Sequence, residues 1–166
     1  MQKLEAFIGR IVDTVGTGLA VLLVLMVLNV SYDVMMRYIF QASSVGMQEM
    51  EWHLFSLIIL FGTGVALRHE GHVRVDFIYD RMPAKRKALI NIWGTIFMLV
   101  PLALLIFFGS FEYVSDAWVT NEISEDPGGL TNRWIIKSMI PISMAFLLLS
   151  AVGYVLKNIM VYREAK

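Results

Sequence analysis

Hydrophobic residues gather in four long runs, and most polar residues lie between these runs. Charged residues and histidine are missing from residues 14–32, 54–67, 88–111 and 138–156. A helix needs about 20 mostly apolar residues to cross a bilayer, and inside hydrocarbon its backbone N–H and C=O groups must pair within the segment. The pattern therefore predicts an all-α membrane protein with four transmembrane helices.

The second run is shorter than a span requires, so its helix is expected to begin earlier, near Met47. Glu49 and Glu51 then lie at the level of the lipid headgroups. Pro101 is expected to kink the third helix. With these adjustments the predicted spans form a single membrane domain, residues 1–166, and cover about 14–36, 47–67, 88–111 and 138–157.

The loop charges predict the orientation of the spans. Short loops that hold Lys and Arg stay on the cytoplasmic side of a membrane. If both termini and the central loop, residues 68–87, share one side, that side carries 11 of the 14 Lys and Arg residues. Both termini and the central loop are therefore predicted to be cytoplasmic, and the other two loops to face outward.

An apolar stripe runs along part of the central loop. Val75, Ile78, Tyr79 and Met82 recur with the spacing of one helical face, and Pro83 follows them. This spacing predicts an amphipathic helix at about 74–82 that lies in the membrane surface. The alternative is a short solvated connector.

The composition excludes several classes of function. The chain has 57% hydrophobic residues, no net charge and no Cys, so it offers no disulfide, no thiol nucleophile and no basic block for nucleic acid. No nucleophile, base and oxyanion donor can be grouped at a suitable spacing, and no enzyme or cofactor is predicted. Carriers place ionisable residues inside the membrane, and the centres of these spans have none.

The three histidines are candidate metal or haem ligands. His69 and His72 are three residues apart, whereas the zinc protease motif needs a spacing of four. Haem ligands must face one another within a bundle, but His53 and the His69–His72 pair lie at opposite ends of one span. No metal site is predicted, and interfacial polar residues are the simpler interpretation.

Two further features left alternatives open. Gly62 and Gly64 permit close helix contact, either within the molecule or with a partner. Arg37 and Glu49 flank a short outward loop, where they either pair or are solvated separately.

Several segments resemble the small membrane subunit, the Q-type subunit, of tripartite ATP-independent periplasmic (TRAP) transporters. Residues 67–76 read LRHEGHVRVD, close to the family signature LRxGGHVRVD, with Glu70 where the family commonly has Gly. Residues 37–40, Glu49 and residues 61–62 also match. Residues 51–55 (EWHLF) and 124–130 (SEDPGGL), followed by Trp134 and Lys137, resemble the branch labelled for mannitol or chloroaromatic compounds. The similarity extends over residues 37–157.

The resemblance implies a scaffold subunit of a sodium-coupled, binding-protein-dependent importer of an organic acid or related small solute in a bacterial inner membrane. Its implied partners are a large multi-span membrane subunit, a periplasmic substrate-binding protein and membrane lipids. The residues expected at structural, partner or lipid interfaces are Arg37, Tyr38, Glu49, Gly62, Arg68, His72, Arg74 and Asp76. Those expected in an outer docking loop are Glu122, Ser124, Glu125 and Trp134. The alternatives are a small homodimeric carrier and a haem-bearing anchor of a redox enzyme.

The orientation can be tested with reporter fusions. A reporter inserted near Glu122 is expected outside the cytoplasm, and one fused after Lys166 inside it, because Lys and Arg are concentrated on the side of the termini. Enzymatic activity of the two reporters in intact cells measures this. The reverse pattern would show that the charge count misassigned the sides.

Overall fold

The computed structural model describes residues 1–69, 79 and 81–164, and within these residues the regular structure is helical throughout. The helices are α1 (Gln2–Ile39), α2 (Val45–Arg68), α4 (Ala84–Gly94), the π-helix η1 (Thr95–Leu99), α5 (Val100–Val119) and α6 (Trp134–Glu164). Since α4, η1 and α5 are continuous, the described chain has four helices long and apolar enough to cross a membrane. The predicted all-α class with four such helices is confirmed.

Each helix is longer than the apolar segment it contains. The 38 residues of α1 extend about 57 Å at 1.5 Å per residue, against a hydrocarbon thickness of about 30 Å. Its first 12 residues precede the uncharged run and carry charged side chains. The amphipathic helix predicted at 74–82 lies mostly outside the described residues, as do the predicted site residues His72, Arg74 and Asp76.

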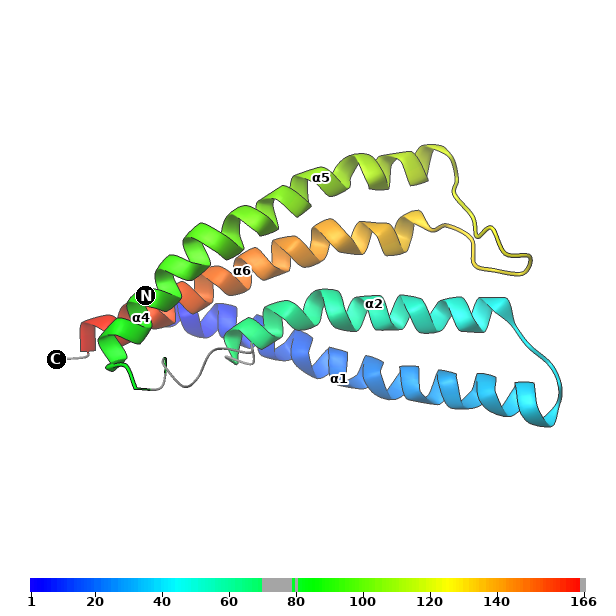
Figure 1. Ribbon diagram of the computed structural model, residues 1–166, viewed down its shortest axis with the longest axis horizontal. Helices are drawn as coiled ribbons and strands as arrows, with labels where there is room; N and C mark the ends of the chain where they lie inside the picture. Colours follow the sequence, from blue (N-terminus) through cyan, green and yellow to red (C-terminus); the bar gives the residue numbers. More distant parts are fainter. Residues whose placement is uncertain (70–78, 80, 165–166) are drawn as a thin grey trace.

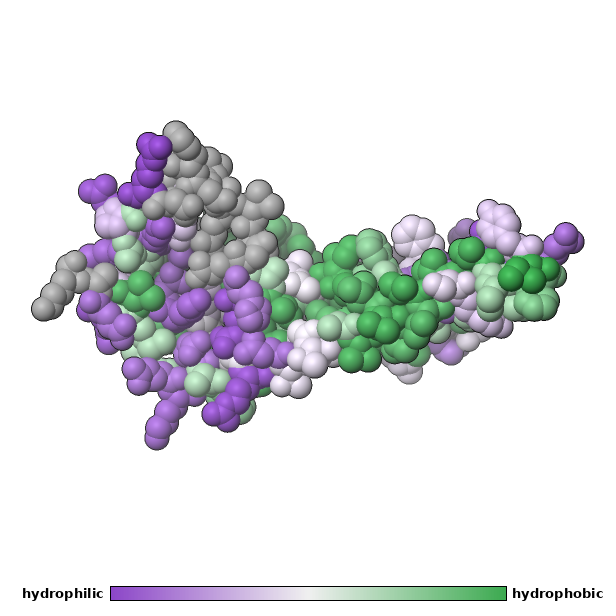
Figure 2. All heavy atoms as spheres, turned by 90° about the horizontal axis from the view of Figure 1, so that it is seen from below, coloured by the Kyte–Doolittle hydropathy of each residue, from purple (hydrophilic) through white to green (hydrophobic). Residues whose placement is uncertain are grey.

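Helix α6 is the centre of the arrangement. It contacts α5, α4, α2 and α1, and α1 also packs on α2. Figure 1 shows α5, α6, α2 and α1 side by side in that order, with both chain termini at one end of the molecule. We call this the terminal end, and we call the opposite end, formed by residues 40–44 and 120–133, the loop end. Seen at right angles in Figure 2, the apolar half is a thin slab, and hydrophilic residues gather at the terminal end.

The buried core lies toward the terminal end. Ile8 and Val12 of α1 pack with Phe146 of α6 in one cluster. Leu67 of α2 packs with Ala151 and Tyr154 of α6 in a second. The outer faces of α1 and α5 remain uncovered, and many of their large apolar side chains are exposed. Apolar surface of this extent belongs against lipid or another protein.

The spacing between α2 and α6 is set by Gly64. A Cβ atom at this position would lie 2.7 Å from Phe146 Cε1 and 3.1 Å from Ser150 Oγ, so only glycine allows the approach. A Cβ atom on Gly62 would meet nothing within 4 Å. Of the two glycines considered from the sequence, Gly64 therefore makes the contact within the molecule, and Gly62 faces outward.

The wide turn η1 ends at Leu99, two residues before Pro101. Pro101 has no N–H, and its ring crowds the preceding turn of an α-helix. In η1 the Val100 N–H reaches the carbonyl oxygen of Thr95, five residues earlier, which is the pattern of a π-bulge. The long helix thus passes the proline through a widened turn, at the place where the sequence predicted a kink.

Replacing Gly64 by Val is expected to destabilise the protein by about 1–3 kcal/mol, because the new side chain collides with Phe146. Gly62→Val is the matched control, since it changes helix propensity equally without a collision. Thermal unfolding of both variants in detergent measures the difference. Equal effects of the two substitutions would contradict this account of the α2–α6 contact.

Candidate functional site

The loop end is held together by the carboxylate of Glu49. One of its oxygens accepts a hydrogen bond from Ser124 Oγ, and the other accepts one from the Leu130 N–H. Both donors belong to the loop between α5 and α6, so a side chain near the start of α2 fixes a segment some 75 residues away. A Cβ atom on Gly129 would collide with Ser124 and Glu49, which explains the glycine at this position.

The loop itself, residues 120–133, is folded by short-range turns. The Gly129 N–H donates to the Asp126 carbonyl, the Ser124 N–H to Leu130 O, and the Arg133 N–H to Glu122 O, each at 3.0–3.1 Å. Gly128 has a φ of 86°, which glycine adopts at no steric cost. A turn at residues 126–129 therefore returns the chain from α5 to α6.

A second group of contacts joins the end of α5 to the start of α6. Lys137 forms an ion pair with Glu122, and its Nζ lies 3.9 Å from the ring centre of Tyr113. The rings of Trp118 and Trp134 meet edge to face, with centres 4.5 Å apart. Glu122, Ser124 and Trp134 thus take part in the internal structure of the loop end, and the side chain of Glu125 is exposed.

The turn from α1 to α2 has its own polar contacts. Arg37 pairs with Asp33 one helical turn earlier, and Asp33 is only 3% exposed. Asn29 Nδ2 donates to the Met47 carbonyl at 3.0 Å and so joins the two helices. Pairing of Arg37 with Glu49, one of the alternatives from the sequence, is wrong, because each residue has a different partner. Tyr38 is 79% exposed.

At the terminal end, Arg68 joins α2 to α1. Its Nε and Nη2 lie 3.0 and 3.3 Å from the two carboxylate oxygens of Asp13, and its Nη1 lies 3.1 Å from Glu5 Oε1. The hydrogen bond from Arg68 lowers the pKa of the Asp13 carboxyl. The guanidinium rests where a Cβ atom on Gly9 would be. Arg68 is thus bound within the molecule, in a cluster that sequence periodicity did not predict.

Two asparagine side chains, one of them buried, make a further link at this end. Asn91 Nδ2 donates to Asn158 Oδ1 at 2.8 Å and so connects α4 to α6, and the Tyr79 hydroxyl lies 3.0 Å from Asn91 Oδ1. Asn158 is 5% exposed. The only sign of this link in the sequence is an asparagine near the polar end of each of two apolar segments, and the spacing of hydrophobic residues did not predict it.

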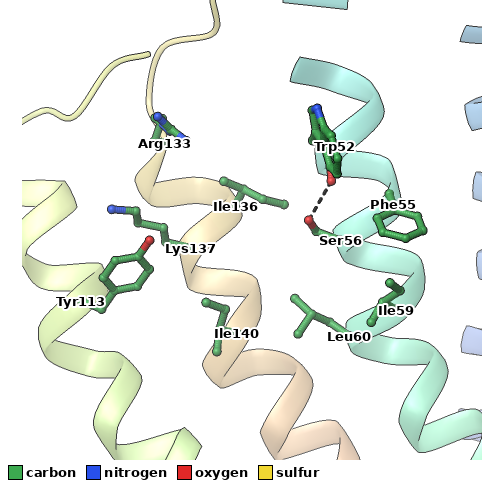
Figure 3. Close-up of a pocket in the computed structure, with 10 residues that line it drawn as sticks. All are labelled: Trp52, Phe55, Ser56, Ile59, Leu60, Tyr113, Arg133, Ile136, Lys137 and Ile140. Atoms are coloured by element: carbon green, nitrogen blue, oxygen red, sulfur yellow. Dashed lines mark hydrogen bonds between the residues drawn. The ribbon is translucent and has the colours of Figure 1, made fainter. Parts of the chain in front are cut away.

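A groove opens between the halves of α2 and α6 that lie toward the loop end. It has a volume of about 480 Å³ and is mainly apolar. Figure 3 shows its lining residues: Trp52, Phe55, Ser56, Ile59, Leu60, Tyr113, Arg133, Ile136, Lys137 and Ile140. A second cavity of about 350 Å³ is lined by other α2 and α6 residues, among them His53, together with loop residues 130–132.

The arrangement of the described residues favours a binding role over a catalytic one. Among them, no three His, Asp or Glu side chains gather as metal ligands would. His53 lies beside the second cavity, and His69 Nε2 is 3.1 Å from Asp13 Oδ1 at the other end of α2. The arrangement can therefore hold a partner, a loop or a lipid.

Comparison with known proteins finds a family model and a relative that this chain resembles. A family model described as "Tripartite ATP-independent periplasmic transporters, DctQ component" matches residues 26–160. The chain is also 26% identical over 121 residues to the sialic acid TRAP transporter permease protein SiaT of Haemophilus influenzae (strain 86-028NP). That match covers 72% of this chain and 19% of SiaT, so the chain spans about a fifth of the length of this relative.

Changing Glu49 to Gln is expected to loosen residues 124–130. Gln is neutral, so the Leu130 N–H would donate to an uncharged amide oxygen, and the Ser124 hydroxyl would have to turn and accept from the amide nitrogen. A hydrogen bond to a charged group contributes about 1.5–3 kcal/mol and a neutral one about 0.5–1.5 kcal/mol, so the Leu130 amide should exchange with deuterium roughly five- to tenfold faster. Hydrogen exchange with mass spectrometry measures this, with Glu51→Gln as the control. Unchanged exchange in the Glu49 variant would contradict the assignment.

Proposed function

The chain belongs to the DctQ component family of TRAP transporters, and from this membership we propose that it is a small scaffold subunit that widens the immobile frame of the transporter. The family is a transporter component and not an enzyme. We further propose that the complete transporter is coupled to sodium and imports an organic acid or a related small solute. Residues 51–55 and 124–130 favour the branch labelled for mannitol or chloroaromatic compounds, but that label does not identify the substrate.

The scaffold role is carried by one observation: charged contacts occupy both ends of the helices, and the middle of every span lacks ionisable residues. Helix α2 is attached by Glu49 at one end and Arg68 at the other, with no ionisable residue from 54 to 67. A transport site for an ion or a charged solute needs polar groups within the membrane. This chain has the composition of a frame, and the transport site belongs to a partner.

The proposed partner in the membrane is a large multi-span subunit. The chain corresponds to about a fifth of the permease protein SiaT, and a separate larger chain would supply what this one lacks. The exposed apolar faces of α1 and α5 and the outward-facing Gly62 are suited to contact with that subunit or with lipid. The resemblance in sequence supports the same partner.

The orientation follows the distribution of Lys and Arg. We place the terminal end in the cytoplasm and the loop end in the periplasm, in a bacterial inner membrane. Arg37 and Glu49 then stabilise the periplasmic end, where exposed Tyr38, Glu125 and their neighbours face a substrate-binding protein. His72, Arg74 and Asp76 remain proposed contacts at the cytoplasmic exit, next to a proposed interfacial helix at 74–82 that binds membrane lipids.

Co-purification tests the scaffold role. The chain, tagged after Lys166 and extracted gently from native membranes, is expected to bring down one large multi-span protein in equal amount, identified by mass spectrometry. Recovery as a homodimer without that partner would instead favour a small self-sufficient carrier.

A substitution at Glu49 distinguishes a scaffold role from a place in the transport site. Glu49→Ala is expected to reduce recovery of the partner or docking of the binding protein, because the loop end loses its anchor, and to leave the sodium affinity of the complex nearly unchanged. Glu51→Ala is the control, and titration calorimetry measures the affinity. A large shift in sodium affinity would place this chain in the transport site and exclude the scaffold role.

A further inference from the structure

The groove between α2 and α6 results from the way these helices are joined. They touch closely at Gly64 and Phe146, and at the loop end they are held through the hydrogen bonds of Glu49 to the loop. Between these two points their side chains do not fill the space. The resulting volume of about 480 Å³ is within the usual range of ligand sites, about 300–1,000 Å³.

The chemistry of the groove changes along its length. Away from the loop its lining is apolar, with Leu60 and Ile140 between the two helices and Ile59 at the rim, all inside the predicted spans (Figure 3). Its end nearest the loop carries the cations Arg133 and Lys137. Trp52 and Phe55 are 69% and 44% exposed, so the groove is open along the exposed apolar surface of α2.

The two cations are not equivalent. Lys137 is 13% exposed and is bound by Glu122 and the Tyr113 ring. Arg133 is 40% exposed, and its nearest described carboxylate contact, Nε to Glu122 Oε1, is 3.8 Å, longer than a hydrogen bond. Glu49 is also close enough to interact electrostatically with Arg133, but both of its oxygens accept hydrogen bonds from the loop. Arg133 can therefore bind a further anion through its remaining N–H groups.

We propose that this groove binds one phospholipid, with its phosphodiester on Arg133 and one acyl chain along Phe55, Ile59 and Ile140. An arginine pairs with phosphate oxygens through two parallel N–H groups. A phospholipid carries its anion and its apolar chain in the same order, and at the same membrane depth, as the groove presents their partners. The bound lipid fills the space that the helices leave between them. Assignment to the outer leaflet rests on the proposed orientation; binding itself does not.

The first test counts bound lipid by native mass spectrometry of the purified complex. Arg133→Gln is expected to retain about tenfold less phospholipid than the unmodified chain, because it removes the charged partner of the phosphate. Ser56→Phe, which fills the groove, should also lose the lipid. Ser56→Ala removes only the hydroxyl, which hydrogen-bonds to Trp52 O, and Arg10→Gln makes the same charge change on α1, so both should retain it. Retention by both Arg133→Gln and Ser56→Phe would overturn the proposal.

The second test locates the lipid. A phosphatidylglycerol with a diazirine in the middle of one acyl chain is expected to cross-link, on illumination, to peptides that contain residues 55–60 or 136–140. Adducts found only elsewhere, or a segment of the large subunit occupying the groove, would contradict the site. Recovery of the large subunit is measured in the same samples, so loss of lipid with normal recovery separates this proposal from the scaffold role.

Discussion

Charged hydrogen bonds can form in this molecule only beyond the apolar part of its helices, and the remaining structure depends on that constraint. Glu49 binds the loop between α5 and α6 at one end of α2, and Arg68 binds Asp13 and Glu5 at the other. Between Glu49 and Arg68, the contacts of α2 are specified by how closely its side chains fit those of its neighbours. A glycine at 64 and an aromatic ring at 146 therefore set how closely α2 and α6 approach.

The consequence is a molecule with one well-packed end and a wide, thin remainder. Helix α6 contacts all the other long helices and supplies many of the buried residues, whereas α1 and α5 bury few. A free-standing bundle would cover more of its own apolar surface. The structure is therefore well suited to being one layer of a larger membrane assembly, in which lipid and protein complete the packing.

The sequence alone predicted the helices but not the contacts between them. Three uncharged runs of about 20 residues and a shorter fourth run predicted four long helices because hydrocarbon leaves the backbone no alternative. Contacts between residues far apart, such as Arg68 with Asp13 across 55 positions, leave no periodic signal. For the same reason Glu49 was recognised as a boundary residue but its Ser124 and Leu130 partners were not. Arg37 and Asp33 are a different case: they are four residues apart on one helix, a spacing visible in the sequence, but pairing with Glu49 was the alternative considered. Gly62 and Gly64 could be told apart only once α6 was in place.

Both termini lie at the same end of the molecule because the chain crosses its length four times (Figure 1). Because the number of crossings is even, a polypeptide joined after α6 begins on the same side of the membrane as α1. A membrane protein whose first segment begins on that face can be linked directly, as one continuous gene product, without inverting either part. One that begins on the opposite face needs an extra crossing in the joint.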